Sequence, residues 1–450
     1  MAEELASFAS SKRYEDLSSN ASEQAKIRIL DSLGCAFGAI GAEPIEGLRR
    51  FQTEMGGAPR CTLFGGGKTA ADRAAFFNGA LVRYLDFNDS FLAKNETCHP
   101  SDNLAPVLAA AEYAGASGKD LIVSLAVAYQ VQCRLSEVAP VRDHGFDHVT
   151  QGSYAVSAGA SRALGLDAEK TANAVAISGT ALNALRVTRT GKLSNWKGLA
   201  YPFMASNAVK ATFLAKEGVT GPLEVFEGNK GLMDAITGKF EIDWKSEDIE
   251  IVTRTILKRY NSEVHSQSAV YCILKIKEKY NLTSEDVLDI NVRIFDVAFK
   301  IIGGGEEGNK QESIETKEQA DHSLPYILAV ALIDGKVMPE QYTPDRIGSS
   351  DVQTLLRKIR IIPDRAFSAK FPDAMPCEIT VHTKQGKRIQ ESTNDYPGFL
   401  TRPMSWEEAL QKFRMVSSRS LEPSRQEQIA SAVRSLDKME SEDLVIFLGN

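Results

Sequence analysis

The sequence predicts a mostly α-helical protein with a large all-helical domain and a smaller α+β domain. Residues 22–250 are rich in Ala, Leu and Val, and their apolar residues recur at helical spacing. Beyond residue 250, several short runs alternate apolar and polar residues, which is typical of strands. A helical pattern returns near the C-terminus. We therefore expect a helical domain over 1–250, to which 400–450 returns, and an α+β domain over 251–399.

The helices predicted for the first domain each present an apolar stripe more than one residue wide. Their high content of Ala and Gly lets neighbouring helices approach closely, which favours a dense bundle. The clearest of these helices are predicted at 103–116, 120–139, 153–166, 168–185 and 204–219.

The second domain is expected to combine strands with helices. Alternation predicts strands at 248–257, 287–295, 356–364 and 377–392, the last a hairpin that turns at 384–387. Helices are predicted between them, at 265–280 and 317–334. Ser405 and Glu408 then form a capping-box pattern, which predicts the start of the C-terminal helices.

Composition excludes several classes of protein. The 450 residues are 43% hydrophobic and 25% charged, which suits two packed domains. A net charge of −7 without a long basic run argues against a nucleic-acid partner. The N-terminus lacks the apolar segment of a secretory signal, and no run approaches the roughly 18 apolar residues of a membrane span. We therefore expect a cytoplasmic protein with no membrane contact. The six cysteines form no C-x-x-C pair, which argues against a zinc knuckle, a redox dithiol and an iron–sulfur cluster. No other residues have convincing metal-ligand spacing, and neither a metal nor a cofactor is expected.

The segment "YLDFNDSFLAKNETCHPSDN" (84–103) carries the strongest signal for chemistry. Asp86 and Asp89 are three residues apart and would share one face of a helical turn, and His99 follows after a short loop. Carboxylates beside an imidazole can have pKa values pushed apart, one group serving as base and another as acid. The alternative is that Asp89 and Ser101 are caps and His99 is an ordinary loop residue.

Further polar clusters lie at other expected helix boundaries. Each alone could be a solvated, charged loop, yet together with 84–103 they hold five of the six histidines. The clusters are His144 and His148; Arg186, Arg189, Lys192 and Lys197; Lys258, Arg259 and His265; and His322 with Tyr326.

These residue types together suit the removal of water from a polycarboxylate. Cationic side chains bind carboxylates, a base takes the proton from the carbon beside a carboxylate, and an acid protonates the departing hydroxyl. The G-x-S-x-G and H-E-x-x-H motifs, which would indicate a serine hydrolase or a zinc protease, are absent from the sequence.

The amino-acid sequence of several segments resembles that of the MmgE/PrpD family, and the segments are spread over nearly the whole chain. The segments include "HPSDNLAPVLAAAEY", "GFDHVTQGSYAVSAGASRALGL", "GKLSNWKGLAYPFMASNAVKATFLAKEG", "EVHSQSAV" and "DHSLPYILAVALIDG". The likeness is closest to the 2-methylcitrate dehydratase branch. It implies a large helical domain built from both chain ends, an α+β lid domain and a homodimer. It also implies a cytoplasmic, metal-independent and cofactor-free hydro-lyase of propionate catabolism, the methylcitrate cycle, which dehydrates 2-methylcitrate or citrate to a cis-aconitate-type alkene.

The predicted site combines positions that match the family's motifs with Arg189 and Lys192, which come from the cationic cluster alone. Lys197, Lys258 and Arg189 would hold substrate carboxylates; His99, His148 and Asp86 are alternative acids and bases; and Tyr326 would donate to the departing hydroxyl. The full set has catalytic candidates Asp86, His99, His148, Lys197, His265 and Tyr326, and substrate-binding candidates Asp89, Arg189, Lys192 and Lys258.

Two alternatives stay open. A cis-aconitate decarboxylase or an iminodisuccinate-type epimerase of the same family would use similar groups, although Glu263 stands where the decarboxylases carry a catalytic histidine. A non-catalytic, dimeric protein that binds polycarboxylates is the alternative from another class. Shared architecture does not decide among these activities.

Overall fold

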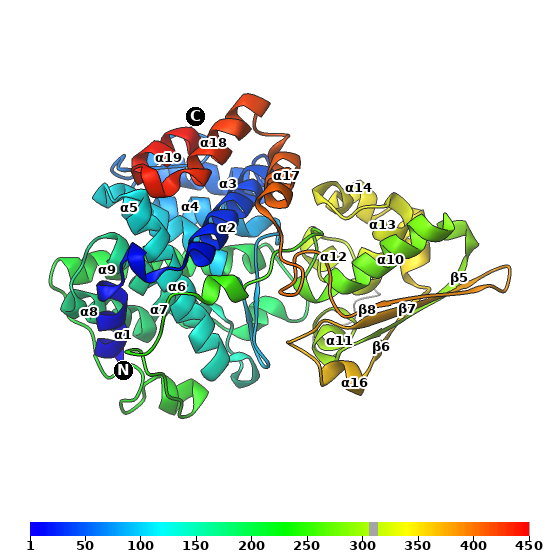
Figure 1. Cartoon of the computed structure of the whole chain (residues 1–450), viewed down its shortest axis with the longest axis horizontal. Helices are drawn as coiled ribbons and strands as arrows, with labels where there is room; N and C mark the ends of the chain where they lie inside the picture. The colour runs from blue at the N-terminus through cyan, green and yellow to red at the C-terminus, as the bar shows by residue number, and fades with distance from the viewer. Residues whose placement is uncertain (306–313, 450) are drawn as a thin grey trace. The chain divides into compact units, whose positions relative to one another are not determined.

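The computed structural model describes residues 1–305 and 314–449 of the chain. Clustering of contacts separates two compact units (Figure 1). We call the first the helical unit, which comprises Met1–Thr188, Gly198–Thr255 and Ser405–Asn450. The second, the mixed unit, comprises Arg189–Lys197 and Ile256–Met404. The expectation of a mostly α-helical, two-domain chain is thereby confirmed.

The helical unit is a bundle with two short antiparallel ladders, β1 (Cys61–Thr62) with β2 (Lys68–Thr69) and β3 (Phe91–Leu92) with β4 (Thr97–Cys98). Its α-helices are α1 (Ala2–Ser11), α2 (Ser19–Gly38), α3 (Glu43–Met55), α4 (Ala71–Tyr84), α5 (Leu104–Ala114), α6 (Gly118–Val138), α7 (Val149–Ala163), α8 (Ala168–Ala181), α9 (Trp196–Lys216), α17 (Trp406–Ser417), α18 (Pro423–Arg434) and α19 (Ser441–Leu448).

Helix α7 shows why the bundle is dense. All of its residues are buried, and most of them are small. A Cβ atom at Gly152 would lie 2.4 Å from the Tyr201 ring, and one at Gly159 would lie 2.8 Å from the Ala128 side chain. Since these distances are below van der Waals contact, the small residues of α7 are what let its neighbours pack so closely.

The mixed unit contains a four-stranded sheet in the order β6-β5-β7-β8. Its central pair, β5 (Val287–Ile294) and β7 (Cys377–Thr383), is antiparallel, β6 (Ile359–Pro363) runs parallel to β5, and β8 (Arg388–Thr393) completes the predicted hairpin. The α-helices are α10 (Gln267–Tyr280), α11 (Asp296–Ile302), α12 (Lys317–Ala320), α13 (Leu324–Asp334), α14 (Pro344–Ile347), α15 (Ser350–Leu356) and α16 (Arg365–Ser368). Helix α10 packs on β7 and β8 and against α13.

Three predicted elements differ from the structure. The strand expected at 248–257 is a 3₁₀ turn, Ile251–Arg254, because the backbone after it bonds to a helix: Arg28 of α2 donates to the Thr255 carbonyl at 2.7 Å. The helix expected at 168–185 ends at Ala181. The helix expected at 317–334 is interrupted between α12 and α13, where Ser323 caps α13 by accepting the Tyr326 N–H at 3.2 Å.

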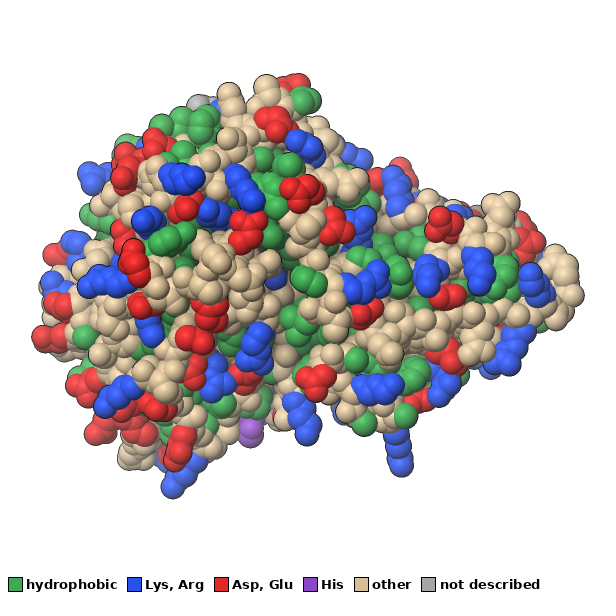
Figure 2. All heavy atoms as spheres, viewed as in Figure 1, with side chains coloured by type: hydrophobic (Ala, Val, Ile, Leu, Met, Phe, Trp, Pro, Cys, Tyr) green, Lys and Arg blue, Asp and Glu red, His purple; other side chains and the backbone are tan. Residues whose placement is uncertain are grey.

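The start of α17 agrees with its predicted capping box, since Ser405 and Glu408 exchange side-chain and backbone hydrogen bonds. Acidic and basic side chains are interspersed on the face of the molecule seen in Figure 2. Among the described residues, none of the helices has the length and apolar character that crossing a bilayer requires.

Candidate active site

The acidic motif lies in a loop after α4, residues 85–90, which we call the acidic loop. Asp86 adopts a left-handed backbone conformation (φ 54°) as the helix ends, and its N–H donates to the Arg83 carbonyl at 3.0 Å. The expectation that Asp86 and Asp89 share a helical turn is therefore wrong. A short polar residue tolerates this conformation better than most, which explains an Asp at the turn.

Buried hydrogen bonds hold the first half of the acidic loop. The Arg83 guanidinium lies 2.6 Å from an Asp86 carboxylate oxygen and 3.6 Å from Asp102, and all three side chains are almost completely buried. The Asn88 amide donates to the Ser101 hydroxyl at 2.9 Å and to Asp102 at 2.8 Å. This network fixes Asp86 beside the Arg83 guanidinium.

Asp89 has the capping role that the sequence left open. One carboxylate oxygen accepts the backbone N–H and the hydroxyl of Ser101 at 3.0 and 2.6 Å, and the other accepts the Tyr129 hydroxyl at 2.8 Å. Ser101 belongs to the 3₁₀ turn Pro100–Asn103, so Asp89 satisfies a donor at the start of that turn. Burial raises the pKa of Asp89, although the Ser101 bonds and the Arg28 charge oppose the shift.

Two buried histidines face one another in the helical unit. The His99 and His148 ring centroids are 5.5 Å apart at an angle of 75°. His99 Nδ1 lies 2.8 Å from the Asp89 carbonyl oxygen, and His148 Nδ1 lies 3.1 Å from an Asp147 carboxylate oxygen. Because the Asp89 carbonyl can only accept a hydrogen bond, Nδ1 carries the proton in the neutral His99 ring and Nε2 is its basic nitrogen.

Glu96, in the turn between β3 and β4, ties the two histidine segments together. Its carboxylate accepts the backbone N–H groups of Val141 and Arg142 at 3.2 and 3.1 Å. The contact joins the hairpin that leads into His99 with the segment that leads into His148. Burial raises the pKa of Glu96, and the Arg142 charge opposes the shift.

The mixed unit holds a second cluster around Asp321. One carboxylate oxygen lies 2.7 Å from Lys197 Nζ and 2.8 Å from His322 Nδ1, and the other lies 2.7 Å from Lys317 Nζ. Lys197 Nζ is also 3.0 Å from His322 Nδ1. Burial alone would raise the pKa of Asp321, but the two lysine charges outweigh it and leave the pKa well below its usual range.

His265 and Glu263 form a buried pair in the same unit. The carboxylate lies 2.7 Å from His265 Nδ1 and also accepts the His265 backbone N–H at 2.8 Å. Among the described residues, the buried Nε2 atom of His265 has no hydrogen-bond partner. Burial alone would raise the pKa of Glu263. The charges of His265, His322 and Lys258 outweigh this effect and lower the pKa to about 2.

Three other predicted residues have different surroundings. Arg189 is buried and donates to the Lys197 carbonyl at 2.7 Å, so it holds the segment that carries Lys197. Lys192 is exposed. The Tyr326 hydroxyl donates to the Gln341 carbonyl, which gives it a structural partner.

Sequence reasoning missed four residues that shape these clusters, namely Arg83, Glu96, Asp147 and Asp321. A local signal was available for two of them, since Asp147 and Asp321 each directly precede a buried histidine. Arg83 stands three residues before Asp86, a spacing at which helical side chains meet. Glu96 reaches a segment more than forty residues away, and no local pattern marks it.

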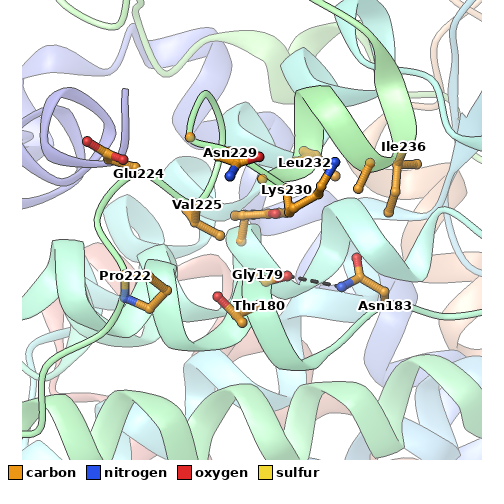
Figure 3. Close-up of a pocket in the computed structure, with 14 residues that line it drawn as sticks. Gly179, Thr180, Asn183, Pro222, Glu224, Val225, Asn229, Lys230, Leu232 and Ile236 are labelled. Carbon is orange, nitrogen blue, oxygen red and sulfur yellow. Dashed lines mark hydrogen bonds between the residues drawn. The ribbon is translucent and has the colours of Figure 1, made fainter.

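A separate cavity of about 370 Å³ lies in the helical unit, between the end of α8 and residues 222–236. Thr180, near the end of α8, and Asn183, just after that helix, line one side of the cavity, while Val225, Leu232 and Ile236 line it from the other segment (Figure 3). The residues that line this cavity include none of the predicted site residues.

Curated relatives resemble this chain over most of its length. The 2-methylcitrate dehydratase of Escherichia coli (strain K12) is 27% identical over 467 residues, which cover 96% of this chain and 93% of that protein. The mitochondrial 2-methylcitrate dehydratase of Yarrowia lipolytica is 28% identical, covering 85% of this chain and 77% of that protein. The cis-aconitate decarboxylase of Mus musculus is 25% identical, covering 93% and 86%. These relatives are enzymes by name, and both activities are lyase reactions.

Family models account for nearly all of the sequence. The MmgE/PrpD N-terminal domain matches residues 3–245, and the MmgE/PrpD C-terminal domain matches residues 260–438. The two matches follow one another in the order that their names require, and the first alone covers more than half of the chain. The resemblance noted in the sequence is confirmed, and the protein belongs to the MmgE/PrpD family.

Proposed function

We propose that this protein is a hydro-lyase that removes water from 2-methylcitrate, or from citrate, to give a cis-aconitate-type alkene. The observation that carries the proposal is the pair of buried imidazoles, His99 and His148, whose ring centroids are 5.5 Å apart and each of which has an oxygen atom within 3.1 Å of Nδ1. The names of the relatives, dehydratases among them, support it. Elimination of water needs one base and one acid close together, and two histidines can supply both.

The acid and the base can be divided between the two rings. A neutral ring takes the proton from the carbon beside a substrate carboxylate through Nε2, while the other ring, in its protonated form, gives a proton to the departing hydroxyl. The Asp147 carboxylate, 3.1 Å from His148 Nδ1, would stabilise the positive charge of that ring when it is protonated, as the carboxylate of a catalytic triad does.

Lys197 and Lys258 are proposed to bind the substrate carboxylates. Lys197 and Lys258 are both buried, where an ammonium group acts more strongly on a carboxylate than it does in water. Negative charge grows on the carboxylate beside the carbon that loses its proton, so these contacts would strengthen in the transition state. Asp86 and His265 complete the proposed catalytic set. Asp89 and Arg189 are proposed to act by holding His99 and Lys197 in place.

A decarboxylase is the second candidate, supported by the name of the mouse relative. Both reactions develop negative charge beside a carboxylate, so similar groups serve either one. A homodimer is also part of the proposal, and light scattering of the purified protein tests it.

The experiment incubates purified, EDTA-treated protein separately with 2-methylcitrate, citrate and cis-aconitate. Alkene absorbance in the ultraviolet and headspace carbon dioxide are followed in the same samples. We expect absorbance to rise from 2-methylcitrate or citrate without release of gas. Gas from cis-aconitate would replace the proposal with a decarboxylase, and tight binding without turnover would indicate a binding protein.

A further inference from the structure

The C-terminal helix α17 places a buried lysine against the acidic loop. Lys412 Nζ donates to the Phe87 carbonyl at 2.8 Å and lies 3.8 Å from the centroid of the Phe87 ring. It also lies 2.7 Å from an Asp31 carboxylate oxygen, and the two charged side chains are 4% and 1% exposed. The Lys412 ammonium group therefore links helix α2, helix α17 and the acidic loop.

The sequence of α2 makes room for this contact. Asp31, Gly34 and Gly38 follow at helical spacing along one face. A Cβ at Gly34 would lie 3.1 Å from the Phe413 backbone, and a Cβ at Gly38 would lie 2.5 Å from the Val416 side chain. The two glycines thus let α17 approach α2 closely enough for Lys412 to reach Asp31 and the loop beyond it.

The carbonyl that Lys412 holds lies in the middle of the acidic loop. Phe87 follows Asp86, whose backbone is left-handed, and precedes Asn88, whose amide joins the Ser101 network. Two residues later, the Asp89 carbonyl accepts the Nδ1 proton of His99. The position of the Phe87 peptide therefore bears on the orientation of His99.

We infer that Lys412 is a positioning residue: its ammonium group, neutralised by Asp31, fixes the acidic loop so that the Asp89 carbonyl orients His99. The inference rests on the proposed function for its catalytic consequence. The anchoring of the loop can be tested without it.

The test variant is the double substitution Asp31→Asn with Lys412→Met. It removes both charges together, because a single substitution would leave a buried charge without its partner. The matched control is Lys26→Met with Asp437→Asn. Lys26 also lies on α2, pairs with a carboxylate in the C-terminal segment and donates to a backbone carbonyl, that of Arg434, at 3.2 Å. The partners of Lys26 in these interactions, Arg434 and Asp437, lie outside the acidic loop.

We measure kcat, KM, melting temperature and hydrogen exchange of the peptide that covers residues 85–99. In the test variant we expect kcat to fall by about 10- to 100-fold, since small misplacements of catalytic groups cost that much. KM should stay within about threefold, and exchange in 85–99 should accelerate. The control variant should have a melting temperature lowered by about as much as that of the test variant. Its kcat should stay within about twofold of wild type, and hydrogen exchange in 85–99 should be unchanged. Lys412→Arg keeps the positive charge but not the compact shape of the ammonium group, so it should retain more of kcat than the double variant does.

Either half of the result can overturn the inference. Unchanged exchange in 85–99 would mean that Lys412 does not anchor the loop. Faster exchange with wild-type kcat would mean that the anchor does not serve the chemistry. A wild-type protein with no turnover of the three acids would defeat the proposed function, and exchange alone would then decide whether the loop is anchored by Lys412.

Discussion

His99 donates its Nδ1 proton to the backbone carbonyl of Asp89 at 2.8 Å. The acceptor is part of the main chain, so no substitution of the Asp89 side chain removes it directly. An asparagine at position 99 could keep this hydrogen bond, because its amide nitrogen can take the place of Nδ1, but it has no counterpart of the basic Nε2. An asparagine at position 99 therefore tests the basic nitrogen of His99 separately from its hydrogen bond to the Asp89 carbonyl.

We expect His99→Asn to lower kcat by about 10²- to 10⁴-fold, the usual contribution of a general acid or base. Substrate binding and the melting temperature should change little, because the bond to Asp89 is kept. The control is His144→Asn, at an exposed histidine of the same unit, which should leave kcat unchanged. Near-normal turnover by the His99 variant would remove this residue from the mechanism.

Two lysines on the same carboxylate provide a second comparison. Lys197 and Lys317 each place Nζ 2.7 Å from Asp321; Lys197 also lies 3.0 Å from His322 Nδ1 and belongs to the proposed catalytic set. Removing either lysine weakens the compensation of a buried charge, so both Lys→Met variants should lose about 2–4 kcal/mol of unfolding free energy.

Only Lys197→Met should also lose turnover, by at least about 100-fold, if its ammonium group binds a substrate carboxylate. Urea unfolding and steady-state kinetics on the two purified variants check both parts. Equal losses of kcat would show that Lys197 acts only through the stability of the Asp321 cluster.

Local patterns were sufficient for most of the fold. The strands over 287–295, 356–364 and 377–392 and the capping box at Ser405 depend on alternation and on spacings of a few residues, and the structure contains all of them. The strand expected at 248–257 is wrong because its backbone atoms bond to side chains of distant helices: the Thr255 carbonyl accepts from Arg28 of α2, and the Ile251 N–H donates to the Gln130 side chain of α6. Alternation shows that a segment is half-buried, but not which element covers it.

The candidate site likewise has features that local sequence patterns show and features that depend on contacts between distant segments. Three buried histidines have a carboxylate oxygen close to Nδ1, and in each case the acidic residue lies one or two positions earlier in the sequence. They are His148, His265 and His322. The pattern alone is not sufficient, because Asp143 precedes His144 and that histidine is exposed. Burial separates the two cases, and it depends on contacts between segments that no local pattern reveals.

Tyr326 offers a test of the role that the resemblance implied for it. Its hydroxyl donates to the Gln341 carbonyl, and burial raises its pKa, so it is a structural donor in this arrangement. We expect Tyr326→Phe to lose about 1 kcal/mol of stability, the usual net value of one hydrogen bond, with kcat within about threefold of wild type. Tyr342→Phe is the matched control, because its hydroxyl also donates to a backbone carbonyl, that of Asn261. A loss of kcat of about 100-fold in the Tyr326 variant alone would instead support proton donation by this hydroxyl.

Acid should weaken the mixed unit through Glu263. Its pKa is about 2 in the folded chain, against an ordinary 4.5, so between these values the unfolded chain binds more protons and stability falls as pH falls. The shift corresponds to about 3 kcal/mol that is present above pH 4.5 and lost towards pH 2. Urea unfolding at pH 3–6 should therefore show wild type and Glu263→Gln converging as pH falls. The exposed control Glu285→Gln should stay parallel to wild type, and a constant gap for Glu263→Gln would contradict the assignment.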